Sequence, residues 1–174
     1  MKVEVKSIKH CASLSHETLA FTGKVYVNGK HVGEAENSGH GGCTDVRTAW
    51  KGEKDEKGYP LYSDAEKKAV DDLYEWAKDN NKYGLEGLID DIVQEELNWR
   101  DFQSLKRTKV VYYSAEKNSI MGFKKPKTIT QDDINSGEFE SALQERPWWK
   151  EGNVFLNSVK KAEFIDKYMP VWAS

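Results

Sequence analysis

Hydrophobic and polar residues alternate along residues 20–35, on both sides of the dipeptide Asn28-Gly29. Asn-Gly readily supplies the two positive φ angles that a type I′ turn requires. The pattern therefore predicts a β-hairpin in which the numbers of facing residues sum to 57, so that Val25 faces Val32.

The same register can be extended away from the turn. It places Ala35 on the polar, half-wet face of the hairpin. Beyond the strands it sets Glu17 against His40 and Leu14 against Cys43. Three glycines lie within residues 39–42, which is typical of positive φ angles or close backbone approach rather than of continued strand pairing.

Apolar residues recur at helical spacing in two later segments. Ser63 and Glu66 form a capping-box pattern that predicts a helix over residues 64–79. A second and longer helix is predicted over residues 85–106.

The remaining segments are shorter. Residues 2–8 read as a strand that pairs with the first hairpin, and residues 110–123 read as a second hairpin. Thr130 and Ser136 are expected to cap short helical turns, residues 153–156 to form a short strand, and Ser158 to cap a last helix. The inward residues of this last helix are expected to be Val159, Ala162, Ile165 and Met169.

This order of elements predicts a single α+β domain over residues 1–174. The sheet is expected to be mainly antiparallel, built from two hairpins plus flanking strands and covered by amphipathic helices. The order of its strands and the oligomeric state cannot be read from the sequence.

Composition and charge narrow the class of protein. The sequence contains no apolar run of the length that a signal peptide or a membrane span requires, and it has only two cysteines. We therefore expect a cytoplasmic protein with no membrane partner and no disulfide. The net charge of −3 hides a segregation, because residues 34–101 hold 18 acidic and 9 basic side chains, whereas residues 106–127 hold 7 basic and 1 acidic.

Histidines and cysteines gather near one end of the predicted hairpin. The extended register could bring together four zinc-type ligands, namely Cys11, His16, His40 and Cys43. A catalytic interpretation would make Cys43 a nucleophile with His16 or His40 as its base. The spacing matches no established motif, so we expect solvent-facing histidines, inert thiols, no catalytic residue, no metal and no cofactor.

Two charged regions are candidates for binding. The second hairpin interleaves cations with rings, as single-stranded nucleic acids require, through Lys106, Arg107, Lys109, Tyr112, Lys124, Lys125 and Lys127. The second helix carries an acidic face that could meet a basic partner, through Asp90, Asp91, Glu95 and Glu96. Cross-strand packing of the rings and solvation of the acidic face are the simpler alternatives.

The segment FTGKVYVNGKHVGEAENSGHGG, residues 21–42, resembles a pattern in small uncharacterised proteins of phages and bacteria. That resemblance covers the first quarter of the chain and implies no activity or catalytic residue. It does imply one kind of role, because small phage proteins of this size are often inhibitors of host machinery, including anti-CRISPR proteins.

Three hypotheses follow. The preferred one is a non-enzymatic interaction protein with a protein partner, and an inhibitor of a host defence system is its narrower form. The alternatives are a nucleic-acid-binding module that uses residues 106–127, and a small metalloprotein or enzyme that uses the Cys/His cluster.

Overall fold

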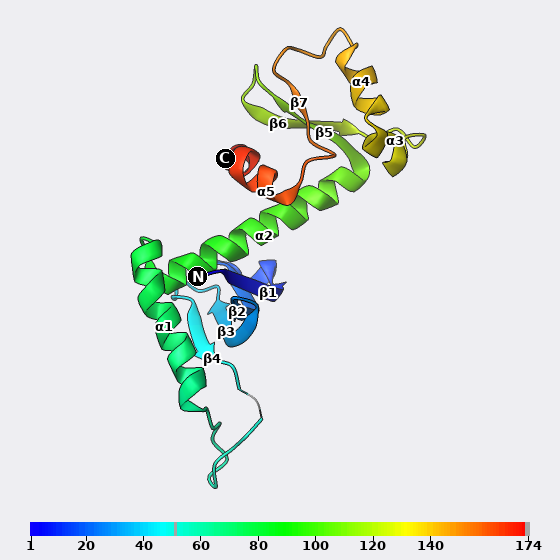
Figure 1. Ribbon diagram of the computed structural model, residues 1–174. Coiled ribbons are helices and arrows are strands. Elements are labelled where there is room, and N and C mark those ends of the chain that lie inside the picture. The colour runs from blue at the N-terminus through cyan, green and yellow to red at the C-terminus, as the bar shows by residue number, and fades with distance from the viewer. Residues whose placement is uncertain (51, 173–174) are drawn as a thin grey trace. The chain divides into compact units, whose positions relative to one another are not determined.

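The structure is a computed structural model that describes residues 1–50 and 52–172 (Figure 1). It contains two antiparallel sheets, one of four strands and one of three, together with helices, which confirms the predicted α+β class. The two hairpins lie in separate sheets. The chain divides into two compact units, Met1–Gln94 and Glu95–Ser174, and the division falls inside one helix, α2 (Gly84–Thr108).

The first unit holds the four-stranded sheet in the order β1-β2-β3-β4. The predicted first strand pairs with the hairpin, and the edge strand β4 was not predicted. The elements of this unit besides α2 are β1 (Val3–His10), η1 (Ala12–Leu14), β2 (Ala20–Val27), β3 (Lys30–Ser38), β4 (Asp45–Thr48) and α1 (Asp64–Asn80).

The turn between β2 and β3 has the predicted geometry. Asn28 and Gly29 have φ angles of 50° and 81°, and Lys30 pairs with Val27. The register then shifts at a β-bulge, because Val25 pairs with Gly33 and not with Val32. The rule that facing numbers sum to 57 therefore holds only beside the turn.

This bulge changes which side chains share a face. One extra residue in β3 turns every later side chain to the opposite side of the sheet. Ala35, expected on the polar face, is buried, while Glu34 and Glu36 lie on the exposed face. The extrapolated pairs of Glu17 with His40 and Leu14 with Cys43 are wrong, since the ladder ends at Ala20 and Ser38.

One face of the first sheet is buried under helices. The predicted capping box of α1 is present, with Ser63 Oγ accepting from the backbone of Glu66. α1 packs against β3 and β4. The buried side chains of α1 and of the first turns of α2 include Val70, Leu73, Ala77, Leu85, Ile89 and Val93. Side chains on the other face of the sheet are exposed, among them Thr22, Lys24, Glu34 and Glu36.

The second unit holds the three-stranded sheet in the order β6-β5-β7. Neighbouring valines of β5 enter different cores: Val111 packs with Phe102 and Phe164, and Val110 packs with Ile134 and Leu143. Successive side chains of a strand point to opposite faces, so both faces of this sheet are covered. The elements of this unit are β5 (Lys109–Ser114), β6 (Ser119–Lys124), α3 (Gln131–Ser136), α4 (Glu138–Gln144), β7 (Val154–Phe155), α5 (Lys161–Glu163), η2 (Phe164–Tyr168) and α6 (Met169–Trp172).

The last helical segment differs from the prediction. It begins at Lys161, and it buries Phe164 and Tyr168 while Ala162 is exposed. Residues 164–168 form a turn of π-helix. The other predicted inward residues, Val159, Ile165 and Met169, are partly buried and pack against the core that contains Phe164 and Tyr168. Among the described helices, none is both long and apolar enough to cross a membrane.

Candidate functional site

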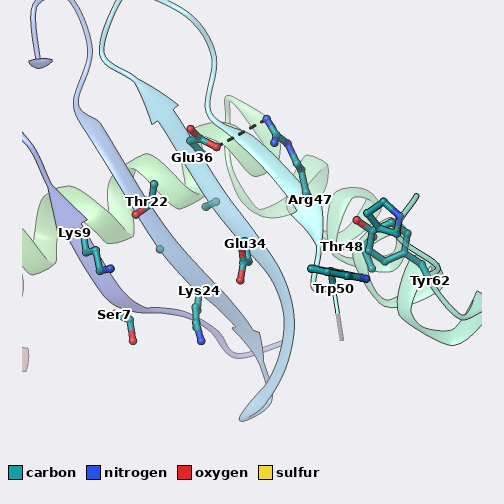
Figure 2. A pocket seen from close by; sticks show the side chains of 13 residues that line it. Ser7, Lys9, Thr22, Lys24, Glu34, Glu36, Arg47, Thr48, Trp50 and Tyr62 are labelled. Atoms are coloured by element: carbon teal, nitrogen blue, oxygen red, sulfur yellow. Dashed lines mark ion pairs between the residues drawn. The ribbon is translucent and has the colours of Figure 1, made fainter. Parts of the chain in front are cut away.

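The open face of the first sheet is hollowed into a depression of about 350 Å³ (Figure 2). Its sides come from all four strands and from the segment after β4. The side chains drawn and labelled around it are Ser7, Lys9, Thr22, Lys24, Glu34, Glu36, Arg47, Thr48, Trp50 and Tyr62.

A second hollow of about 450 Å³ lies beside the first, toward the ends of β1 and β3. The two hollows share the lining residues Lys9, Thr22 and Glu36. The second hollow also reaches His10, Cys11, Leu14 and His40. We call the two hollows together the sheet groove.

Charges in the sheet groove are only partly paired. Arg47 contacts Asp45 at 2.5 Å and Glu36 at 3.9 Å. Lys24 and Glu34 are partners in the strand register, yet neither side chain takes part in an ion pair among the described residues, and the same is true of Lys9. These three groups are therefore available to charges supplied by a ligand.

Two rings border the groove at the end of β4. Trp50 is 45% exposed, and its indole N–H donates to the carbonyl oxygen of Glu53 at 2.6 Å. The ammonium of Lys54 lies 5.4 Å from the centre of the indole ring. Tyr62 lies near Trp50 in Figure 2 and is half-buried. A ring held in this way can bury apolar surface of a ligand with little loss of side-chain entropy.

The far end of the groove is built by a buried amide, Asn37. Its Oδ1 accepts from Thr18 Oγ1 at 2.8 Å and from the backbone of Gly39 at 2.9 Å. Its Nδ2 donates to the Gly42 carbonyl at 3.0 Å and to Thr44 Oγ1 at 3.1 Å. One side chain thus satisfies four groups and holds the glycine-rich loop against β3.

Gly39 completes this end of the groove. Its φ of 85° lies in the left-handed region, and a Cβ there would collide with the carbonyl oxygen of Leu14. The Gly39 carbonyl accepts from the backbone N–H groups of His16 and Glu17, both at 3.0 Å. These contacts bring His16 to His40, and their rings stack with centroids 5.4 Å apart.

The predicted Cys/His cluster is divided between two places. Cys11 and His40 line the second hollow, and His16 stacks on His40. Cys43 lines a separate hollow of about 280 Å³ with Asp90 and Asp91. Within residues 1–50 and 52–172, no group of three or more His, Cys, Asp or Glu side chains is arranged to hold a metal ion.

Electrostatics at Cys43 do not favour a nucleophile. A hydrogen bond to the Glu86 carboxylate, together with the charge of that group, raises the pKa of the exposed thiol. A raised pKa keeps the thiol protonated, whereas activated cysteines have a lowered pKa. A hydrogen bond with the Ser13 hydroxyl lowers the pKa of Cys11, whose exposed sulfur lies 3.3 Å from that oxygen.

The predicted acidic face of α2 has mainly structural contacts. Asp90 Oδ1 accepts from Thr44 Oγ1 at 2.5 Å, and Asp91 accepts from Asn81 Nδ2 at 2.9 Å. Burial raises the pKa of Asp90 against the opposing effect of the Thr44 hydrogen bond. In the second unit, Glu96 pairs with Arg100 at 3.0 Å and with Lys161 at 2.5 Å, and Glu95 lies beside it on α2.

Predicted cations and rings of the second hairpin are placed on different faces. Lys109 and Lys124 are direct partners in the register and share a face with Val111, whereas Tyr112 lies on the face of Val110. Burial lowers the pKa of Lys106, whose ammonium lies 5.2 Å from the ring centre of Phe102. The other predicted nucleic-acid-binding cations, Arg107, Lys125 and Lys127, take part in no ion pair among the described residues.

Sequence reasoning did not identify the sheet groove. Its residues lie far apart in the chain, and only their pairing across four strands brings them together. The available sequence signal was a tryptophan, Trp50, at the start of a charged segment rich in glycine. No protein-family model, no curated protein and no solved structure matches this chain.

Proposed function

We propose that this chain is a non-enzymatic binding protein whose sheet groove holds an extended segment of a partner protein. The observation that carries the proposal is that the two hollows adjoin on one face of the sheet, where the cross-strand row of Lys9, Thr22 and Glu36 lines both. Two adjoining hollows offer an elongated surface, which suits an extended chain better than a compact small molecule.

Charges and rings define the chemistry of the segment. The ammonium groups of Lys9 and Lys24 favour a carboxylate on the ligand, and the carboxylate of Glu34 favours a cation at a neighbouring position of the ligand. Trp50 and Tyr62 favour an apolar or aromatic side chain at one end. The partner segment is therefore a mixed-charge peptide with an aromatic or aliphatic anchor.

The narrower role of an inhibitor belongs to the same proposal. A protein without its own chemistry can block a partner by covering a segment that the partner needs, and the resemblance of residues 21–42 to phage proteins motivates this role. It is supported by the position of that segment, which supplies β2, β3 and the loop at the end of the groove.

Selection from a displayed library of random peptides tests the proposal. We expect binders with acidic and apolar residues, and Trp50→Ala should weaken them about thirtyfold, as loss of a central aromatic contact of about 2 kcal/mol does. Trp148→Ala is a matched control, since Trp148 is also 45% exposed but belongs to the second unit. A library that yields no binder, or binders indifferent to Trp50→Ala, would contradict the proposal.

A further inference from the structure

Trp148 is an exposed ring with a rigid backing in the second unit. It is 45% exposed, and its ring centroid lies 5.9 Å from that of Tyr112, 5.6 Å from that of Phe123 and 5.9 Å from that of Trp149. The backbone N–H of Trp149 donates to the Arg146 carbonyl at 2.9 Å, which closes a turn beneath the two tryptophans. The indole of Trp148 is therefore held in place while part of its surface faces solvent.

The hairpin rings themselves are not the exposed platform. Tyr112 is half-buried and touches both Trp148 and Trp149, and Phe123 meets the edge of Trp148 at an interplanar angle of 83°. Phe123 also packs against a core that includes Val110 and Phe155, and Tyr112 pairs with Phe155 in the strand register. Their role is to support Trp148, so the ring free to stack on a ligand comes from outside the hairpin.

Cations accompany this ring. Arg146 and Lys150 flank the two tryptophans in the chain, and Lys125 and Lys127 follow β6 shortly after Phe123, whose ring meets Trp148. Among the described residues none of these four cations takes part in an ion pair. Glu145 and Glu151 lie at the two ends of residues 146–150 and reduce the net positive charge there, but neither forms an ion pair with these cations among the described residues.

We infer that this surface, the Trp148 platform, is a binding site for single-stranded nucleic acid. The platform consists of Trp148, Arg146, Lys150, Lys125 and Lys127. Single-strand binding needs a ring on which a base can stack and cations that contact phosphates on either side of it. A rigid exposed indole beside unpaired cations meets both needs, and the polyanion supplies the charge that these cations lack.

This inference does not depend on the sheet groove, because every residue of the platform lies in the second unit. A duplex is a poor ligand for it, since stacked and paired bases do not offer their faces to an indole. The shared chemistry of single-stranded DNA and RNA is a stack of bases on a phosphate backbone, so both oligonucleotides belong in the test.

The test measures binding of fluorescein-labelled dT15 and rU15 to the full chain by anisotropy between 50 and 200 mM salt. We expect binding that weakens about fiftyfold over this range if four phosphates are neutralised, from a single-strand slope of about −0.7 for each phosphate. Trp148→Ala should weaken binding about tenfold, as the loss of one stacked base does. Trp148→Phe keeps a ring and should recover most of that loss.

Matched variants separate a specific site from general attraction. Arg146→Glu with Lys150→Glu should abolish binding, while Lys57→Glu with Lys67→Glu changes the net charge equally in the first unit and should leave it nearly intact. Trp50→Ala, at an equally exposed tryptophan, should have no effect. Circular dichroism confirms the fold of each variant.

Three results would overturn the inference. They are no binding at 50 mM salt, equal losses for the two charge-reversal pairs, and an unchanged affinity in both Trp148 variants. A negative result for nucleic-acid binding would not bear on the proposed peptide binding. The peptide test varies Trp50 with Trp148 as its control, and the nucleic-acid test varies Trp148 with Trp50 as its control.

Discussion

Replacing Asn37 with alanine should destabilise the protein more than the small size of the asparagine side chain implies. The side chain is 5% exposed and makes four hydrogen bonds, two as acceptor and two as donor. Its loss leaves the buried N–H of Gly39 without a partner, which costs about 1–3 kcal/mol, and removes a hydrogen bond to Thr18 worth about 1 kcal/mol. The exposed Gly42 carbonyl can turn to water, so we expect a total near 3 kcal/mol.

Urea unfolding followed by far-ultraviolet circular dichroism measures this loss. The control is Asn80→Ala, which removes one hydrogen bond from an exposed asparagine to the Trp76 carbonyl and should change stability by less than about 0.5 kcal/mol. Hydrogen exchange of the Gly39 amide should accelerate in Asn37→Ala. A loss below about 1 kcal/mol would refute the argument that one amide organises the glycine-rich loop.

Three further predictions follow from the fold. Asn28→Ala with Gly29→Ala should cost on the order of 1–3 kcal/mol in thermal or chemical unfolding, because both positive φ angles become strained, and an unchanged midpoint would contradict this. Asp90→Asn should stabilise the protein at pH 7. Burial raises the pKa of Asp90 in the folded state, so the stability of the wild type falls as pH rises above about 4, and the gain from Asp90→Asn should vanish well below pH 4. A gain in stability that is independent of pH would point to packing instead. If the chain is a single domain, as predicted, the NMR signals of Trp76 and Trp99, one in each unit, should disappear in one coincident urea transition, because α2 runs through both units. Two separate transitions would show two domains.

Local sequence signals predicted the parts of the fold that local geometry determines. The Asn28-Gly29 turn has the two positive φ angles that its residues favour. The capping box at Ser63 starts α1, and a second one at Thr130 starts α3. In both capping boxes the backbone group that needs a partner lies within a few residues of the side chain that supplies it.

The errors came from pairings that local patterns do not determine. One bulge near Val32 leaves the alternation of β3 readable but moves Ala35 to the opposite face from the one predicted. The second sheet is separate from the first because Val110 and Val111 each have a core of their own, which depends on distant segments.

The candidate site was harder to predict for the same reason. The sheet groove joins Lys9, Lys24, Glu34 and Trp50 across four strands, and the register that brings them together includes the unpredicted edge strand β4. Sequence spacing did indicate the basic second hairpin as a nucleic-acid candidate. It could not show that Tyr112 is covered or that Trp148, thirty-six residues later in the chain, provides the exposed ring.

The central claim is that the sheet groove holds a peptide segment, and NMR titration tests it most directly. A peptide selected against the chain is added to isotope-labelled protein, and the shifts of backbone amides and of the Trp50 indole N–H are followed. We expect saturating changes at Lys9, Thr22, Glu36 and Trp50, with little change at Trp148. Changes confined to α1 or to the second unit, with the Trp50 indole signal unmoved, would contradict the claim.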